Sequence, residues 1–238
     1  MVVKLVKDLI EVTRRYAGFC FNKRRWTVAS DIVSWKEGIQ YCLDRGTVPV
    51  SLDEAVEARS VLKKEDHAYD YTITCTWGMY EKKEGVLRLK IFEATQSVLE
   101  QVVERLSETD RYLGLKTSDA LYTTLNKLCV KKRTVVVPSE DIQKSVVDSS
   151  YASCNEIKAA LPKQAGNNAK IMKNFRDSAG NKYTKGYFWF LRPNLQEGEA
   201  RVVPLALGGD YCLINDVIAD DDFLDGRSRG LAPVGARK

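Results

Sequence analysis

The side chains of this chain that could bind a polyanion are concentrated in two stretches. Residues 1–30 hold seven lysines and arginines against Asp8 and Glu11, and residues 163–176 hold four cations and no acid. Because clustered cationic groups attract phosphates, the sequence predicts a nucleic-acid partner, with duplex DNA favoured. The predicted nucleic-acid contacts are Arg14, Arg15, Asn22, Lys23, Arg24, Arg25, Lys158, Lys163, Lys170, Lys173 and Arg176.

Residues that could support catalysis are few. His67 is the single histidine, and its position between Asp66 and Ala68 is typical of a surface residue. The run Asp220-Asp221-Asp222 offers the oxygen ligands that Mg²⁺ and Ca²⁺ prefer, but consecutive side chains diverge. Gly208-Gly209 lacks the lysine and the following Ser or Thr of a phosphate-binding loop. We therefore expect a protein that is not an enzyme and needs no cofactor or metal.

The composition is that of an ordinary globular protein. The chain has 238 residues, 44% of them hydrophobic and 29% charged, with a formal net charge of +5. Its apolar runs fall far short of the roughly 20 residues of a membrane-spanning helix, which predicts a cytoplasmic protein without a membrane partner, in the host cell if it is viral. The cysteines are too far apart for a zinc site or a disulfide framework, so we expect reduced thiols. They are Cys20, Cys42, Cys75, Cys129, Cys154 and Cys212.

The first part of the chain indicates a small sheet and a helix. An aromatic strand begins at Gly18, a polar turn covers 22–25, and a second strand starts at Trp26. Residues 39–43 fit a third strand, although a helix over 31–45, starting at Ser30 and stopping at Gly46, fits equally well. Ser51 followed by Glu54 is a capping box, which predicts a helix over 52–64.

A β-hairpin and a covering helix are expected over 68–108. Residues 69–77 alternate apolar and polar side chains, as a half-buried strand does, and 86–92 supply its partner after a turn around 81–85. An amphipathic helix capped near Thr95 follows. We place a domain border near residue 115.

The order of elements over 116–193 resembles a winged helix. A helix capped by Thr117 or Ser118 leads into a strand over 134–137. A second helix starts at Ser139, with Ile142 and Val146 turned inward. A third helix covers 153–161, and a hairpin pairs 169–176 with 186–191. Residues 194–238 add the strand Val202-Val203-Pro204-Leu205 and an acidic, glycine-rich tail.

Residues 14–65 resemble an Apetala-type DNA-binding domain, as found in plant response factors. The resemblance lies in Tyr16-Ala17-Gly18-Phe19, in Lys23-Arg24-Arg25-Trp26 and in the helical pattern of 52–59. It covers about a fifth of the chain. It implies a three-stranded antiparallel sheet that enters the major groove, with one helix packed behind it.

These patterns predict an α+β protein with three parts, 1–115, 116–193 and 194–238. The leading hypothesis is a non-catalytic DNA-associated protein of viral or mobile-element character. The alternative is a structural or assembly protein, such as a virion component or subunit adaptor, or a protein inhibitor. Such a protein acts through protein–protein contacts or self-association of its aromatic strands and tail.

Overall fold

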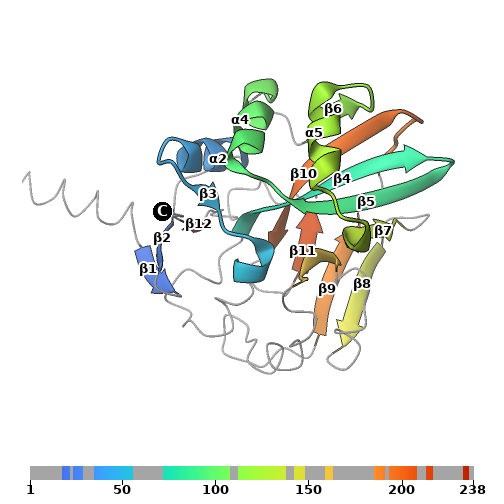
Figure 1. The fold of residues 1–238 in the computed structure, drawn as a ribbon. Coiled ribbons are helices and arrows are strands. Elements are labelled where there is room, and N and C mark those ends of the chain that lie inside the picture. The colour runs from blue at the N-terminus through green and yellow to red at the C-terminus, as the bar shows by residue number, and fades with distance from the viewer. Residues whose placement is uncertain are drawn as a thin grey trace, which may run out of the picture.

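The structure is a computed structural model of the chain, and it confirms the α+β class (Figure 1). It describes residues 18–21, 24–28, 35–55, 72–107, 112–137, 142–147, 159–162, 185–190, 193–207, 213–216 and 233–235. Within these ranges the strands form a four-stranded and an eight-stranded sheet.

The large sheet has the order β7-β5-β4-β10-β11-β9-β8, and β6 also pairs with β10. Strands β11 and β9 are parallel, whereas the other pairs are antiparallel. The strands are β4 (Thr72–Lys83), β5 (Val86–Glu93), β6 (Leu113–Lys116), β7 (Thr134–Val136), β8 (Ile142–Val147), β9 (Lys185–Phe190), β10 (Glu199–Leu207) and β11 (Leu213–Asp216).

The predicted hairpin is confirmed as β4 and β5, which run side by side from Thr76↔Glu93 to Lys83↔Val86. Its turn consists of Glu84 and Gly85, with φ of 55° and 74°. Positive φ at both central residues belongs to the turns that match the twist of paired strands. The turn therefore fixes the register of the β4–β5 pair.

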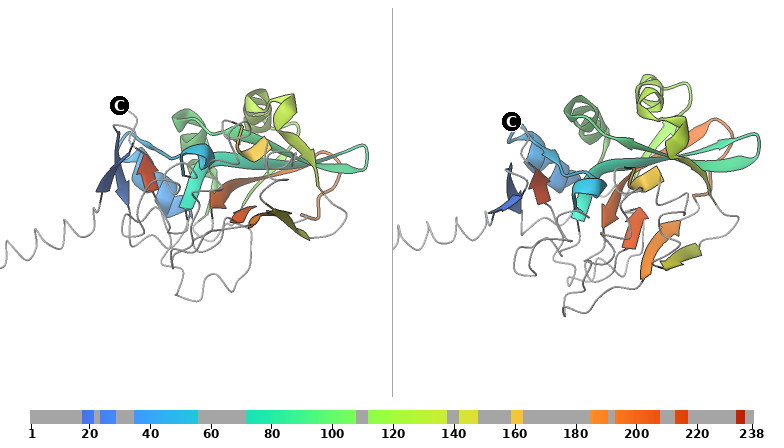
Figure 2. Two further views of the ribbon diagram at one scale, coloured as in Figure 1. Left: turned by 90° about the horizontal axis from the view of Figure 1, so that it is seen from below. Right: turned by 60° about the horizontal axis from the view of Figure 1, so that its bottom comes forward.

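Helices α4 (Gln96–Arg105) and α5 (Ala120–Leu128) cover one face of this sheet (Figures 1 and 2). Trp77, Met79 and Phe92 on that face form one core with the buried residues of both helices. Alternate residues point to the opposite face, where Tyr80 and Leu89 are also fully buried. The central strands are thus buried on both faces.

The central strand β10 contains Pro204, which has no N–H to donate to a neighbouring strand. Its register with β4 shifts between Pro204 and Ala206. At this irregularity the hydroxyl of Thr74 donates to the carbonyl of Leu205 at 2.7 Å. A side chain thus supplies a hydrogen bond where the ladder is interrupted, which explains how a proline fits in the middle of the sheet.

The strand expected over 39–43 is instead part of helix α2 (Trp35–Leu43), so the helical alternative holds. Ile39 and Cys42 are both fully buried, a spacing of three that suits one helix face. The helix ends in a Schellman motif, in which the N–H groups of Gly46 and Thr47 donate to the carbonyls of Leu43 and Cys42, both at 2.9 Å. Gly46 has φ of 63°, as this motif requires.

The small sheet has the order β1-β2-β12-β3. Its predicted hairpin is confirmed, because β1 (Gly18–Phe21) pairs with β2 (Arg24–Val28). The next strand is β12 (Pro233–Gly235), which lies between β2 and β3 (Val48–Pro49). The third strand of the small sheet that we expected at 39–43 is therefore wrong, and the strand next to β2 is β12, which is distant in sequence.

The capping box at Ser51 is confirmed. The N–H of Ser51 donates to Oε2 of Glu54 at 3.0 Å, and the N–H of Glu54 points back to Oγ of Ser51 at 3.3 Å. Residues 52–55 are helical, and the rest of the predicted helix lies outside the described residues.

The predicted helix beginning at Ser139 is wrong over 142–147, which form strand β8 and pair with β9. Ile142 and Val146 are four residues apart, a spacing that places two side chains on one face of a helix and also on one face of a strand. Strand β9 confirms the second arm of the predicted hairpin, although its antiparallel partner is β8. Of the third helix predicted over 153–161, only Ala159, Ala160 and Leu161 are described; the two alanines are helical and Leu161 is not.

The first helix of this region is confirmed as α5, with Leu121 and Leu125 buried. Its cap is Asp119 rather than Thr117 or Ser118, and the Asp119 carboxylate accepts from the N–H of Leu121 at 2.7 Å. Residue 115, where we placed a domain border, lies inside β6. Strands from both sides of that position share the large sheet.

Candidate functional site

Most of the predicted nucleic-acid contacts fall outside the described residues. Arg24 and Arg25 lie in β2, where they pair with Phe21 and Cys20 of β1. The remaining members of the set are not described: Arg14, Arg15, Asn22, Lys23, Lys158, Lys163, Lys170, Lys173 and Arg176. Their convergence on one surface stays a prediction.

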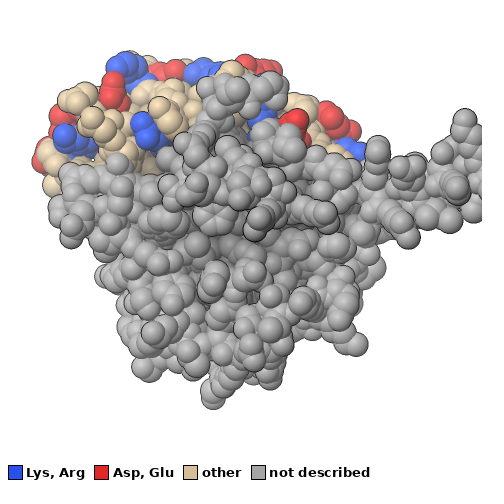
Figure 3. All heavy atoms as spheres, turned by 180° about the vertical axis from the view of Figure 1, so that it is seen from behind, with Lys and Arg blue, Asp and Glu red and all other residues tan. Residues whose placement is uncertain are grey.

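Several cations in the described part of the chain are neutralised by carboxylates. The ion pairs are Lys90–Glu81 at 2.7 Å, Arg105–Asp119 at 2.8 Å, Lys116–Glu199 at 2.9 Å and Arg133–Glu93 at 3.0 Å. Lys and Arg side chains alternate with Asp and Glu on the described part of the face shown in Figure 3. That part of the surface is mixed in charge.

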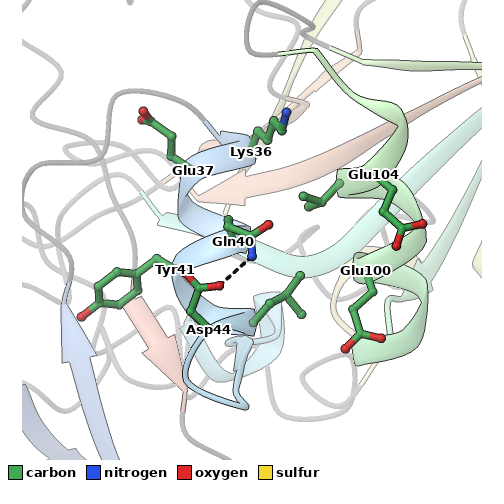
Figure 4. Close-up of a pocket in the computed structure, with 9 residues that line it drawn as sticks. Lys36, Glu37, Gln40, Tyr41, Asp44, Glu100 and Glu104 are labelled. Atoms are coloured by element: carbon green, nitrogen blue, oxygen red, sulfur yellow. Dashed lines mark hydrogen bonds between the residues drawn. The ribbon is translucent and has the colours of Figure 1, made fainter.

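The candidate site is an open cleft of about 820 Å³ between α2 and α4. Its lining residues are Lys36, Glu37, Gln40, Tyr41, Leu43, Asp44, Glu100, Val103 and Glu104. In Figure 4, Gln40 on α2 and Asp44, just after the end of α2, lie across the cleft from Glu100 and Glu104 on α4. The same view shows Glu37 and Tyr41 pointing away from α4.

The apolar side chains of the cleft belong to the core beneath it. Val103 is 8% exposed and belongs to the cluster that contains Ile39, Val98 and Leu99, and Leu43 packs against the same cluster. Burial also raises the pKa of the Cys42 thiol to about 12, on the inner side of α2. The two helices thus rest on a dry interior, and the floor of the cleft is fixed by packing.

Lys36 connects the two sides of the cleft. Its Nζ donates to the carbonyl of Leu106 at 2.7 Å, just after the last residue of α4. A lysine at this position satisfies one of the carbonyls that a helix leaves without an internal partner. The bond joins the start of α2 to the end of α4.

Three carboxylates remain on the rim of the cleft. Asp44 accepts from the amide of Gln40 at 2.7 Å, and Glu100 accepts from the amide of Gln96 at 3.0 Å. Both donors are neutral amides, so neither of these hydrogen bonds is an ion pair. Glu104 makes no hydrogen bond or ion pair with any residue that the structure describes.

A second polar cluster holds α5 on the sheet. Oε2 of the buried Glu81 accepts from the Tyr122 hydroxyl at 2.7 Å, and its Oε1 pairs with Lys90. Lys90 also donates to Asn126 at 2.7 Å. Burial and the bond to Glu81 raise the pKa of Tyr122, and burial raises that of Cys129 to about 11. The cluster keeps Tyr122 protonated as a donor, which suits a structural role.

The sequence contained a signal for the cleft that our prediction did not use. Glu100 and Glu104 are four residues apart on the polar side of a helix that we did predict. Gln40 of α2 and Asp44, the residue after its end, have the same spacing. The helical alternative for 31–45 places Gln40 and Asp44 about one turn apart, whereas the strand expected over 39–43 ends before Asp44.

Within the described ranges, no group of three or more His, Cys, Asp or Glu residues is arranged to hold a metal ion. None of the helices found there is long and apolar enough to cross a membrane. The three cysteines whose side chains are described, Cys42, Cys75 and Cys129, are free thiols.

Comparisons with known proteins give a likeness in fold. No protein-family model matches the sequence, and no curated protein matches it significantly. Among solved structures, the chain is similar to one from work on the accommodation of massive sequence variation in Nanoarchaeota by the C-type lectin fold. The identity is 12% and the TM-score is 0.51, over 82% of this chain and 96% of that one. At this level of identity, the likeness is to the C-type lectin fold alone.

Proposed function

We propose that this chain is a non-catalytic binding protein that acts through protein–protein contacts at the cleft between α2 and α4. The observation that carries the proposal is the composition of the cleft, in which aliphatic side chains form the floor and carboxylates form the rim. A patch of apolar surface surrounded by polar groups is the usual composition of a protein recognition site.

The contacts beneath and across the cleft favour a recognition site that is already ordered before a partner binds. Packing holds Val103 and Leu43, and the bond from Lys36 to Leu106 holds the two helices together. A surface that is already ordered loses less conformational entropy on binding. The C-type lectin fold of the structural neighbour is described as accommodating massive sequence variation, which is the behaviour of a stable scaffold with an adaptable surface.

Binding to duplex DNA remains the competing hypothesis. It depends on the basic stretches 1–30 and 163–176, whereas the described cations Lys90, Arg105 and Lys116 already pair with carboxylates. Association with a labelled duplex at about 50 mM salt, lost at about 300 mM, would support that hypothesis.

The test of the proposal is a photo-crosslinking amino acid placed at Gln40, in the cleft, and at Thr124, an exposed position on α5, in separate full-length proteins. After irradiation in a lysate of source cells, we expect a defined protein adduct from position 40 and not from position 124. The same adduct should disappear when Val103→Arg blocks the cleft of a chain that still folds by circular dichroism. Equal adducts from both positions, or adducts with nucleic acid alone, would overturn the proposal.

A further inference from the structure

We infer that the occupant of the cleft is a short cationic segment of a partner protein, with lysine or arginine beside an aliphatic residue. This inference rests on the proposed function and specifies the chemistry of the partner. It starts from the charge of the rim, in which the carboxylates of Asp44, Glu100 and Glu104 outnumber the single ammonium group of Lys36.

Three nearby cations have contacts with groups other than Asp44, Glu100 and Glu104. Lys36 donates to the carbonyl of Leu106. The guanidinium of Arg45 lies 3.5 Å from the centre of the Tyr41 ring and donates to the Tyr41 carbonyl. Arg105, next to Glu104 in sequence, forms its ion pair with Asp119. The rim therefore keeps its negative potential.

The floor explains why a peptide segment fits better than a small cation. Val103 and Leu43 offer apolar surface between the carboxylates. Lysine and arginine side chains match both parts, because their methylene stems pack on apolar surface while the charged head reaches an acidic group. A volume of about 820 Å³ is in the range that accommodates several side chains.

The probe is a short fluorescent peptide that alternates lysine and leucine, compared with the same peptide carrying glutamate in place of lysine. We expect the full-length chain to bind the lysine peptide and not the glutamate peptide. In the double variant Glu100→Gln and Glu104→Gln, affinity for the lysine peptide should fall about tenfold at low salt, since each exposed ion pair contributes up to about 1 kcal/mol. Raising the salt concentration should remove most of the difference.

The matched control neutralises two carboxylates outside the cleft, Glu84→Gln and Glu197→Gln, both exposed near the β4–β5 turn. It changes the net charge equally and should leave the affinity unchanged. Equal losses in the two double variants would overturn the inference, because they would report net charge alone. Equal binding of the two peptides would also overturn it. A cleft-specific adduct at position 40 to a partner without cationic residues would contradict the inference and leave the proposed function standing.

Discussion

Arg133 and Glu93 form an ion pair of 3.0 Å between the end of the 3-10 helix η2 (Lys131–Arg133) and the end of β5. The arginine side chain is 8% exposed, whereas that of Glu93 is 41% exposed. Arg133 also donates from Nε to the carbonyl of Ala159 at 2.7 Å and from Nη2 to that of Ala160 at 3.3 Å. One guanidinium thus fastens residues 159–160 to the edge of the large sheet.

Replacing this guanidinium should be costly. Arg133→Ala leaves two buried carbonyls without a donor, so we expect the free energy of unfolding to fall by about 3 kcal/mol in urea denaturation. The control is Lys132→Ala, because Lys132 is exposed in the same short helix. A loss below about 0.5 kcal/mol for Arg133→Ala would show that the bonds to Ala159 and Ala160 contribute little.

A methyl group at Gly78 should strain the sheet. An added Cβ would lie 2.7 Å from Cδ1 of Leu89, a fully buried side chain on the neighbouring strand β5. We expect Gly78→Ala to lower the free energy of unfolding by about 1–3 kcal/mol, as overpacking of a core does. Gly114→Ala in β6 is the control, since nothing lies within 4 Å of its added Cβ. Equal stability of the two variants would contradict the expectation.

The bond between Tyr122 and Glu81 should contribute to the docking of α5. Tyr122→Phe removes one donor from a buried carboxylate, and we expect a loss of about 1–2 kcal/mol in thermal or urea unfolding. The control is Tyr112→Phe, which also removes a tyrosine hydroxyl but keeps the ring on which Arg201 stacks at 3.7 Å. If both variants are as stable as the parent, Lys90 alone satisfies Glu81.

The cap of α5 should be sensitive to acid. The hydrogen bond from Arg105, followed by the N–H of Leu121, holds the pKa of Asp119 below its ordinary value of 3.8. A depressed pKa in the folded chain stabilises the fold above the unfolded value, and that contribution is lost as the pH falls through the folded value. Asp119→Asn keeps a capping oxygen and removes the charge.

We therefore expect Asp119→Asn to be less stable than the parent at about pH 7, and the difference to disappear as the pH falls below 3.8 through the lowered pKa of Asp119. Equilibrium unfolding at several pH values measures this difference. A gap between the two proteins that does not depend on pH would show that the Asp119 charge is not coupled to folding.

The elements predicted correctly are those in which local pattern and tertiary contact agree. The β4–β5 hairpin has both alternation and a glycine at its turn, and the capping box at Ser51 formed as expected. The pattern of Ile142 and Val146 fits a helix and a strand equally well. Residues 142–147 form a strand because they pair with β9. Such pairing depends on a partner more than 35 residues away, which local periodicity does not reveal.

The cleft was beyond prediction for a related reason. Each half of its rim is a pair of polar residues four apart on an amphipathic helix, which is ordinary for a solvated surface. The site arises because Ile39 of α2 and Val98 of α4 pack in one core and bring the two rims together. Position in the fold, rather than residue type, distinguishes these carboxylates from others in the chain.

Strand β12 joins β2 to β3 in the small sheet, although more than 180 residues separate it from each of them. During synthesis from the amino end, the β1–β2 hairpin must wait for residues 233–235 before its outer edge is paired. Strand β12, which is made long after β1 and β2, thus completes the sheet that they begin, so deleting residues 233–235 should loosen the β1–β2 hairpin.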